Sequence, residues 1–155
     1  MGTRLFRAAV TSAMTVLALA AAAGPALAAT PAAPAASIAG SNLGASALRA
    51  ALTQQGKPYV WGAAGPGAYD CSGLVQWAFK QTGRALPHNA AMQSALGAPV
   101  APSQLRPGDL VFFYSPVSHV GIYVGDGKIL HASTTGQPVK ISSMKGMPFH
   151  NARRL

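Results

Sequence analysis

The amino-acid sequence predicts an α+β fold, with N-terminal helices packed on a C-terminal antiparallel β-sheet. Between residues 41 and 97 the pattern is helical, with apolar residues three and four apart and capping residues near the expected ends. After Arg106-Pro107-Gly108 the pattern changes to short strand-like runs separated by Gly and Pro. Helices that precede strands, rather than alternating with them, are typical of the α+β class.

Three helices are expected before this change. They are residues 42–55, which end at Gly56, residues 71–82, which Asp70 can cap and Gly83 can end, and a third helix that Asn89 can cap and that stops at Gly97. Four strands are expected after it, at residues 109–114, 119–124, 128–131 and 138–142.

Residues 1–28 have the pattern of a secretion signal. Arg4 and Arg7 form a basic start, residues 8–23 are apolar, and Ala26-Leu27-Ala28 matches the small-x-small cleavage pattern. We therefore expect cleavage after Ala28 and a secreted product that is no longer attached to a membrane. An uncleaved anchor is the alternative, which is disfavoured because the apolar run is rich in Ala and shorter than the ~20 strongly apolar residues of a membrane span.

The remainder is expected to be an Ala/Pro-rich linker at residues 29–40 and a single domain at residues 41–155. The chain contains 12 Lys+Arg and 3 Asp+Glu, so removal of Arg4 and Arg7 with the signal leaves 10 − 3 = +7. This charge suits an extracellular polyanion such as an anionic cell-wall polymer. Nucleic acid is not an expected partner, because the basic residues are scattered and no recognised binding motif accompanies them.

Two classes of chemistry are disfavoured by the residues present. The chain has no Glu, and its acids are Asp70, Asp109 and Asp126, so hydrolysis by paired carboxylates would require two of these three to converge. Neither a Cys-x-x-Cys pair nor a His-Glu-x-x-His motif is present, so no metal site is expected.

Cys71 is the only cysteine, so it has no partner for an internal disulfide. Asp70 before it can cap a helix, which places the sulfur in the first helical turn. Free backbone N–H groups and the positive end of the helix dipole favour a thiolate there. Cys71 also shares the apolar face of that helix, so an inert core cysteine is the alternative to a nucleophile.

His119 and His131 are the candidate bases. If Gly125-Asp126-Gly127 forms the loop between their strands, Gly121 opposes His131, and the two histidines are diagonal neighbours on one face, roughly 7–8 Å apart between Cα atoms. A strict two-residue turn of Asp126 and Gly127 would instead send His131 to the opposite face. A structural role is the alternative for each histidine.

Seven short segments, spread over nearly all of the domain, carry a resemblance to a known family. They are Gly56-Lys57-Pro58-Tyr59-Val60-Trp61-Gly62, Asp70-Cys71-Ser72-Gly73-Leu74-Val75, Leu86-Pro87, Pro107-Gly108-Asp109-Leu110-Val111-Phe112-Phe113, Ser118-His119-Val120-Gly121-Ile122-Tyr123-Val124-Gly125-Asp126-Gly127, Ile129-Leu130-His131-Ala132 and Ala152-Arg153-Arg154-Leu155. The chain thereby resembles the NlpC/P60 family of cell-wall peptidases, a bacterial branch of the papain-like cysteine peptidases.

This resemblance implies a role for each candidate residue. Cys71 would be the nucleophile, His119 the base and His131 the third member that orients His119. Tyr59 would help the oxyanion site, and Asp70 and Ser72 would help to bind the stem peptide. Family members typically cleave peptidoglycan stem peptides between D-isoglutamate and a diamino acid. No cofactor is implied, and we expect a monomer.

One segment departs from the family pattern. After Leu86-Pro87 many members carry an arginine, a polar residue and a serine, whereas this chain has His88-Asn89-Ala90. Ala90 lacks the hydroxyl that the serine would contribute to the substrate pocket. The sequence favours a surface position for His88, with replacement of some of the missing polarity as the alternative, and indicates no role for His150.

Two other function classes remain open at this point. A catalytically silent wall-binding or activator protein could keep this fold, although it would have little use for Cys71, His119 and His131 together. A cysteine hydrolase could also act on another γ-linked or lipid-linked acyl substrate, because a fold does not determine a substrate.

Overall fold

The computed structural model describes the backbone of residues 35–155 and side chains from residue 43 onward. The predicted secretion signal and the first half of the predicted linker lie outside the described residues. The helices are α1 (Ala35–Leu52), α2 (Cys71–Lys80) and α3 (Ala90–Gln93), and a 3-10 turn spans Pro102–Gln104. The strands are β1 (Ala98–Pro99), β2 (Leu110–Phe113), β3 (His119–Gly125), β4 (Lys128–His131), β5 (Lys140–Ser143) and β6 (Phe149–Arg154).

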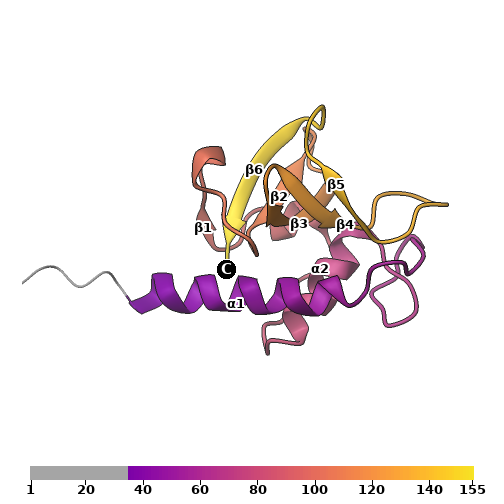
Figure 1. The fold of residues 1–155 in the computed structure, drawn as a ribbon, viewed down its shortest axis with the longest axis horizontal. Helices are drawn as coiled ribbons and strands as arrows, with labels where there is room; N and C mark the ends of the chain where they lie inside the picture. Colours follow the sequence, from indigo (N-terminus) through magenta and orange to yellow (C-terminus); the bar gives the residue numbers. More distant parts are fainter. Residues whose placement is uncertain (1–34) are drawn as a thin grey trace, which may run out of the picture. The chain divides into compact units, whose positions relative to one another are not determined.

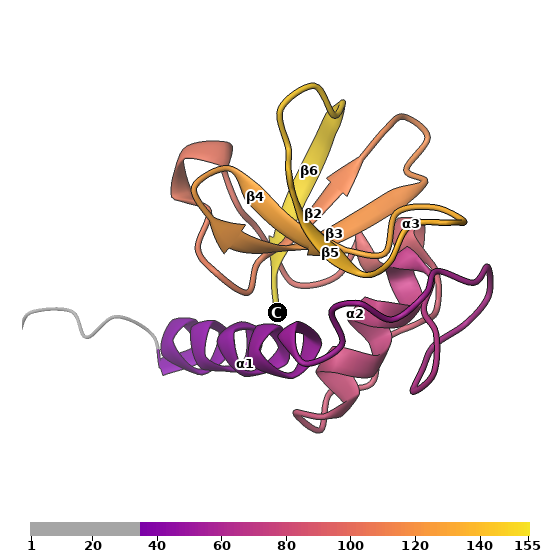
Figure 2. The same cartoon turned by 45° about the vertical axis from the view of Figure 1, so that its right-hand side comes forward.

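The strands form one antiparallel sheet in the order β1-β6-β2-β3-β4-β5. Helices α1 and α2 lie on one side of this sheet (Figures 1 and 2). The chain therefore has the predicted α+β architecture, in which helices precede and cover a C-terminal antiparallel sheet. Among the helices of residues 35–155, none has both the length and the apolarity that a membrane crossing requires.

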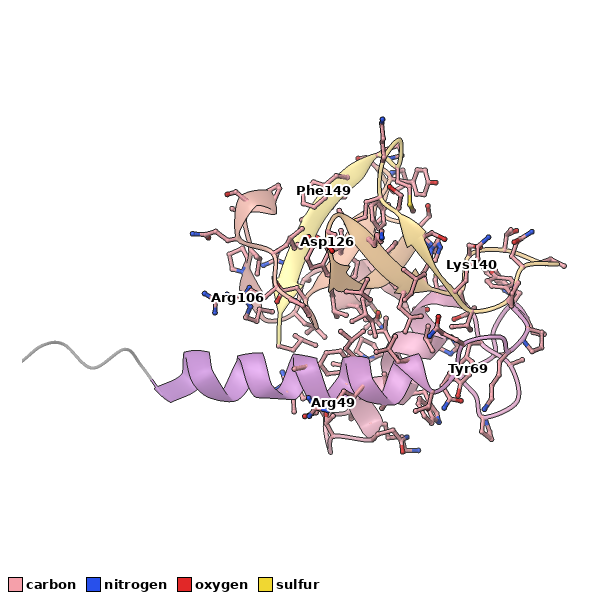
Figure 3. All side chains as sticks on the ribbon, viewed as in Figure 1. Arg49, Tyr69, Arg106, Asp126, Lys140 and Phe149 are labelled. Carbon is pink, nitrogen blue, oxygen red and sulfur yellow. The ribbon has the colours of Figure 1, made fainter. Side chains whose placement is uncertain are left out.

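Strand alternation divides the buried side chains between the two faces of the sheet. On the helix side, Leu110, Phe112 and Ile122 pack with the apolar faces of α1 and α2. Figure 3 shows that side chains fill the space between α1 and the strands. On the other side, Val111 and Phe113 belong to a smaller cluster. Because both faces are covered, the sheet provides a rigid support for residues at its ends.

All three helices differ from their predicted bounds, α2 only in ending at Lys80, two residues early. Helix α1 begins at Ala35, inside the range predicted to be linker, because this segment is rich in Ala, the strongest helix former. Helix α3 is one turn long and does not reach Gly97. The carbonyl oxygen of Ser94, just after α3, accepts hydrogen bonds from the side chains of Asn151 and Arg153 on β6. Tertiary contacts thus replace the next helical turn.

Candidate active site

Cys71 is the first residue of α2. The Asp70 side chain caps this helix by accepting a hydrogen bond from the backbone N–H of Gly73, at 2.7 Å. The cysteine is partly exposed and is not in a disulfide. The predicted cap and helix start are therefore confirmed. The Cys71 side chain is partly accessible rather than fully buried in the core.

The two histidines lie at strand ends that meet. His119 begins β3 and His131 ends β4, and antiparallel pairing brings these ends together. His119 Nε2 lies 2.8 Å from His131 Nδ1. Both side chains are buried, at 8% and 5% exposure. The predicted proximity of the two imidazoles is confirmed.

The route to this proximity differs from the predicted three-residue loop. Asp126 and Gly127 form a two-residue turn with positive φ angles of 51° and 66°, which alone would reverse the face of His131. The pairing register shifts between Tyr123 and Gly125, so β3 contains one extra residue, a β-bulge. Ile122 consequently pairs with Leu130, the register that puts His119 and His131 on the same face.

Two cavities adjoin at Cys71. One, of about 410 Å³, is lined by Asp70, Ser72 and His88 among others, and the second, of about 260 Å³, by Tyr59, His119 and His131 among others. Trp61, Cys71 and Ser118 line both, so the cavities form two halves of what we call the Cys71 cleft. All six residues that the sequence singled out for the site lie along this cleft. Its volume suits a small peptide.

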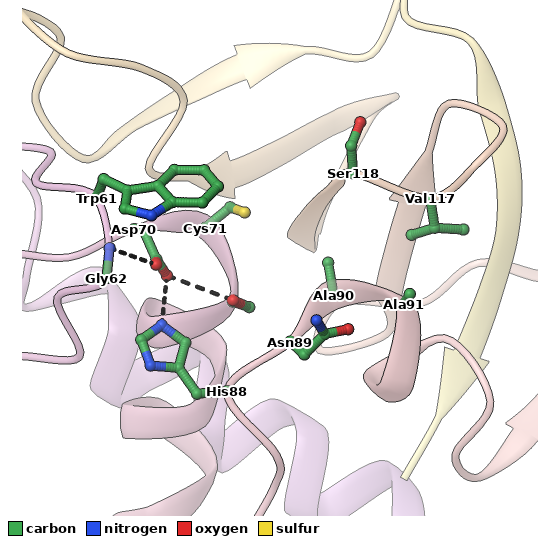
Figure 4. Close-up of a pocket in the computed structure, with 11 residues that line it drawn as sticks. Trp61, Gly62, Asp70, Cys71, His88, Asn89, Ala90, Ala91, Val117 and Ser118 are labelled. Atoms are coloured by element: carbon green, nitrogen blue, oxygen red, sulfur yellow. Dashed lines mark hydrogen bonds and ion pairs between the residues drawn. The ribbon is translucent and has the colours of Figure 1, made fainter.

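Asp70 connects several segments on one side of this cleft (Figure 4). Besides the N–H of Gly73, its carboxylate accepts the N–H of Gly62 at 2.9 Å and the hydroxyl of Ser72 at 3.4 Å. The His88 ring nitrogen Nε2 lies 2.8 Å from Asp70 Oδ1. His88 is an exposed residue, as the sequence favoured, but its ring also lines the cleft and contacts Asp70, so it adds polarity there.

Burial and neighbouring charge govern the Cys71 thiol. Burial raises the pKa of Cys71, the charge of Asp70 raises it further, and nearby backbone N–H groups, including that of Val120, lower it. The net direction is opposite to that expected from the helix start alone. The resting thiol therefore keeps its proton more strongly than a free cysteine and needs a base to remove it.

The histidines are suited to act as neutral bases. Burial lowers the pKa of His119 to about 4, with a further contribution from the charge of His131. Burial, followed by the charge of Lys140, lowers the pKa of His131 to about 4. Both rings are uncharged near neutral pH. Since His119 Nε2 contacts His131, Nδ1 is the ring nitrogen left to accept a proton from Cys71.

Tyr59 lies on the same half of the cleft as the histidines. Burial raises the pKa of its hydroxyl, and the charges of Cys71 and Asp70 raise it further. The hydroxyl therefore stays protonated and can donate a hydrogen bond to an anionic oxygen near Cys71.

Trp61 is a residue of the cleft that sequence reasoning did not single out. Its side chain is 85% exposed and lines both cavities. A large exposed aromatic ring at the junction of two cavities is suited to contact a ligand. The sequence did contain an indication of this role, because Trp61 stands two residues after Tyr59 in one of the segments that resemble the family.

Comparisons with known proteins agree with this geometry. The NlpC/P60 family pattern matches residues 56–153. A probable endopeptidase of Mycobacterium tuberculosis is 55% identical over 108 residues, which are 69% of this chain and 28% of that protein. A probable endopeptidase of Corynebacterium glutamicum is 49% identical over 123 residues, which are 79% of this chain and 56% of that protein. The chain thus spans about a quarter to a little over half of these relatives.

Solved structures share the fold. The NlpC/P60 domain of the peptidoglycan hydrolase SagA superposes with a TM-score of 0.68 at 35% identity, covering 72% of this chain and 98% of that domain. NlpC1 from Trichomonas vaginalis gives a TM-score of 0.67 at 36% identity, covering 72% of this chain and 43% of that one. The chain belongs to the NlpC/P60 family, and its α+β domain has the NlpC/P60 fold.

Proposed function

We propose that this protein is a secreted cysteine peptidase that hydrolyses peptidoglycan stem peptides at the bond between D-γ-glutamate and a diamino acid. The observation that carries the proposal is the 2.8 Å contact between His119 and His131 beside the only cysteine of the chain. Membership of the NlpC/P60 family and similarity to a peptidoglycan hydrolase domain support the choice of substrate.

The first step of the reaction forms a tetrahedral adduct between the Cys71 sulfur and the amide carbon. His119 Nδ1 accepts the Cys71 proton while the sulfur bonds to the amide carbon, and the carbonyl electrons move to oxygen. For this, His119 Nε2 carries hydrogen and donates it to His131 Nδ1, which orients the ring. Backbone N–H groups at the start of α2 and the Tyr59 hydroxyl donate hydrogen bonds to the oxyanion.

The following steps release the peptide. His119 gives its proton to the leaving nitrogen as the C–N bond breaks, and the diamino acid departs as an amine. Water then attacks the thioester while His119 accepts one of its protons. When the resulting tetrahedral intermediate collapses, the C–S bond breaks, His119 returns the proton to the Cys71 sulfur, and a new carboxyl group remains on the glutamate. No cofactor takes part in this scheme.

Substrate recognition is assigned to the other half of the cleft. Asp70 and Ser72 are placed to contact the stem peptide, and Trp61 borders both halves. Ala90 lines this half and offers no hydroxyl. This half of the cleft therefore offers one side-chain hydroxyl fewer to the stem peptide than it would with a serine at position 90.

Digestion of purified sacculi tests the proposal. The mature protein and Cys71→Ala are incubated with sacculi, and the soluble products are identified by mass spectrometry. We expect the mature protein, but not Cys71→Ala, to release fragments that begin with a free diamino acid. Binding without release would favour a silent wall-binding or activator protein. Intact sacculi with hydrolysis of another γ-linked or acyl substrate would favour a different cysteine hydrolase.

A further inference from the structure

Asp70 and His88 form a titratable pair beside Cys71 to which the proposed chemistry gives no proton-transfer step. Their contact is 2.8 Å long, and the side chains are 10% and 28% exposed, respectively. They come from different segments, since Asp70 caps α2 and His88 lies in the chain before α3. In Figure 4 the imidazole of His88 points toward the Asp70 carboxylate, next to Cys71.

The net charge of the half of the cleft that contains Asp70 depends on the charge of His88. The titratable side chains lining this half of the cleft are Asp70, Cys71 and His88, without a Lys or Arg among the lining residues. The other groups that donate to Asp70 are uncharged, namely the N–H of Gly62, the N–H of Gly73 and the hydroxyl of Ser72. Within the described residues, His88 is the one ion-pair partner of Asp70.

The Asp70 charge acts on the neighbouring thiol. Cys71 follows Asp70 directly in the chain, and the negative carboxylate opposes formation of a second negative charge on the sulfur. An imidazolium against Asp70 cancels that opposition, whereas a neutral imidazole keeps the hydrogen bond and leaves the carboxylate charge in place.

We propose that His88 is a positioning residue that sets the charge beside Cys71: protonated, it neutralises Asp70 and favours the thiolate, and neutral, it leaves Asp70 to oppose the thiolate. The proposal rests on the cysteine peptidase function, because the charge matters for activity only if Cys71 is the nucleophile.

Alkylation of Cys71 by iodoacetamide measures this effect without peptidoglycan. Because Cys71 is the only cysteine, the mass increase of the intact protein reports on it alone. Second-order rate constants are measured from pH 5 to 9 for the wild type, His88→Arg and His88→Gln. Both substitutions keep an N–H donor for Asp70, but only arginine keeps a permanent charge. The matched control is His150→Gln, which replaces an exposed histidine outside the Cys71 cleft.

We expect His88→Arg to react on the order of three- to tenfold faster than His88→Gln at one pH, as for one unit charge screened near a protein surface. His150→Gln should match the wild type throughout. Superimposed profiles for folded His88→Arg and His88→Gln would overturn the proposal.

Asp70→Asn tests whether the charge acts through the carboxylate. The difference between His88→Arg and His88→Gln should disappear when Asp70→Asn is added. If it persists, the charge acts directly on Cys71, and the assignment to Asp70 is overturned. The two experiments test separate claims. If the alkylation rates of His88→Arg and His88→Gln differ but sacculi are not digested, the stem-peptide function is overturned. If sacculi are digested but the two alkylation profiles coincide, only the role of His88 is overturned.

Discussion

His131 leaves one of its ring nitrogens without a partner. In the tautomer that lets His119 act as a base, His131 Nδ1 accepts a hydrogen bond, so its Nε2 carries the hydrogen. Within the described residues, this buried Nε2 has no hydrogen-bond partner. An unpaired buried donor costs about 1–3 kcal/mol. We infer that orientation of His119 requires an acceptor at this position and does not require an imidazole.

The two histidines should therefore differ in their effect on turnover. His119→Ala should lower kcat/KM on a soluble muropeptide by about 10²- to 10⁴-fold, because the base is lost. His131→Ala should cost less, and His131→Asn should retain more of the rate than His131→Ala, since an amide oxygen can accept the His119 N–H. His150→Ala is the control. An unaffected His131→Ala together with an inactive His150→Ala would contradict the assignment.

Sequence reasoning located the residues of the site better than their contacts. The lone Cys71 after a capping Asp70 follows local helix rules, so its position could be predicted. The contact between His88 and Asp70 joins residues 18 positions apart, separated by α2 and the irregular chain that follows it, and no local periodicity describes such a contact. The direction of the Cys71 pKa shift likewise depends on burial in the folded chain, which the helix start alone does not reveal.

At the scale of elements, the sequence pattern alone could not determine the turn between β3 and β4. Gly125-Asp126-Gly127 is compatible with a two- or a three-residue loop, and the two alternatives put His131 on opposite faces. The protein combines the short turn with a bulge before Gly125. The hydroxyl of Tyr123 accepts the N–H of Gly127 across this turn. Strands β2 to β5 were predictable, because alternation and turn residues are local signals, whereas β1 was not among the predicted strands.

A second prediction at the scale of elements concerns the close packing of α2 against the segment that contains Tyr59 and Ala63. A Cβ at Gly73 would overlap the backbone carbonyl oxygen of Ala63, whereas a Cβ at Gly67 would meet no atom within 4 Å. Gly73→Ala should lower the free energy of unfolding by about 1–3 kcal/mol and reduce turnover, because the start of α2 must shift. Gly67→Ala should leave both unchanged. Urea unfolding of the two variants checks this, and equal stabilities would count against the packing argument.

At the scale of the whole molecule, burial of two neutral histidines makes stability depend on pH. The pKa values of about 4 for His119 and His131 lie below the ordinary value of 6.5, so the unfolded chain binds more protons between these limits. Their contribution to stability is present above pH 6.5 and is lost as the pH falls toward 4. The free energy of unfolding should decrease by at most about 2.7 kcal/mol per pH unit there.

Urea unfolding between pH 6.5 and 4.5 measures this slope. His131→Asn removes one of the two titrating groups and should reduce the slope by about half, while His150→Asn should leave it unchanged. A slope that stays the same in His131→Asn would show that other groups cause the acid sensitivity.

The basic charge of the molecule leads to a separate prediction about the wall. For the +7 chain expected after signal removal, binding to whole cell walls should weaken steeply between about 0.05 and 0.5 M salt, as the Debye length falls from roughly 14 to 4 Å. Turnover of a small soluble muropeptide should change much less, because contacts within the cleft are short. Wall pull-down and soluble turnover across the same salt series make the comparison. Binding that stays constant in high salt would indicate specific recognition of glycan or peptide instead.

The central claim is that Cys71 attacks one defined bond of the stem peptide. The most direct measurement compares the wild type with Cys71→Ser on a soluble muropeptide of known structure, with the products identified by mass spectrometry. The account predicts one cleavage, between D-γ-glutamate and the diamino acid, and a loss of nearly all turnover in folded Cys71→Ser, because a hydroxyl is a far weaker nucleophile than a thiolate. Cleavage at a different bond, or undiminished turnover by Cys71→Ser, would contradict it.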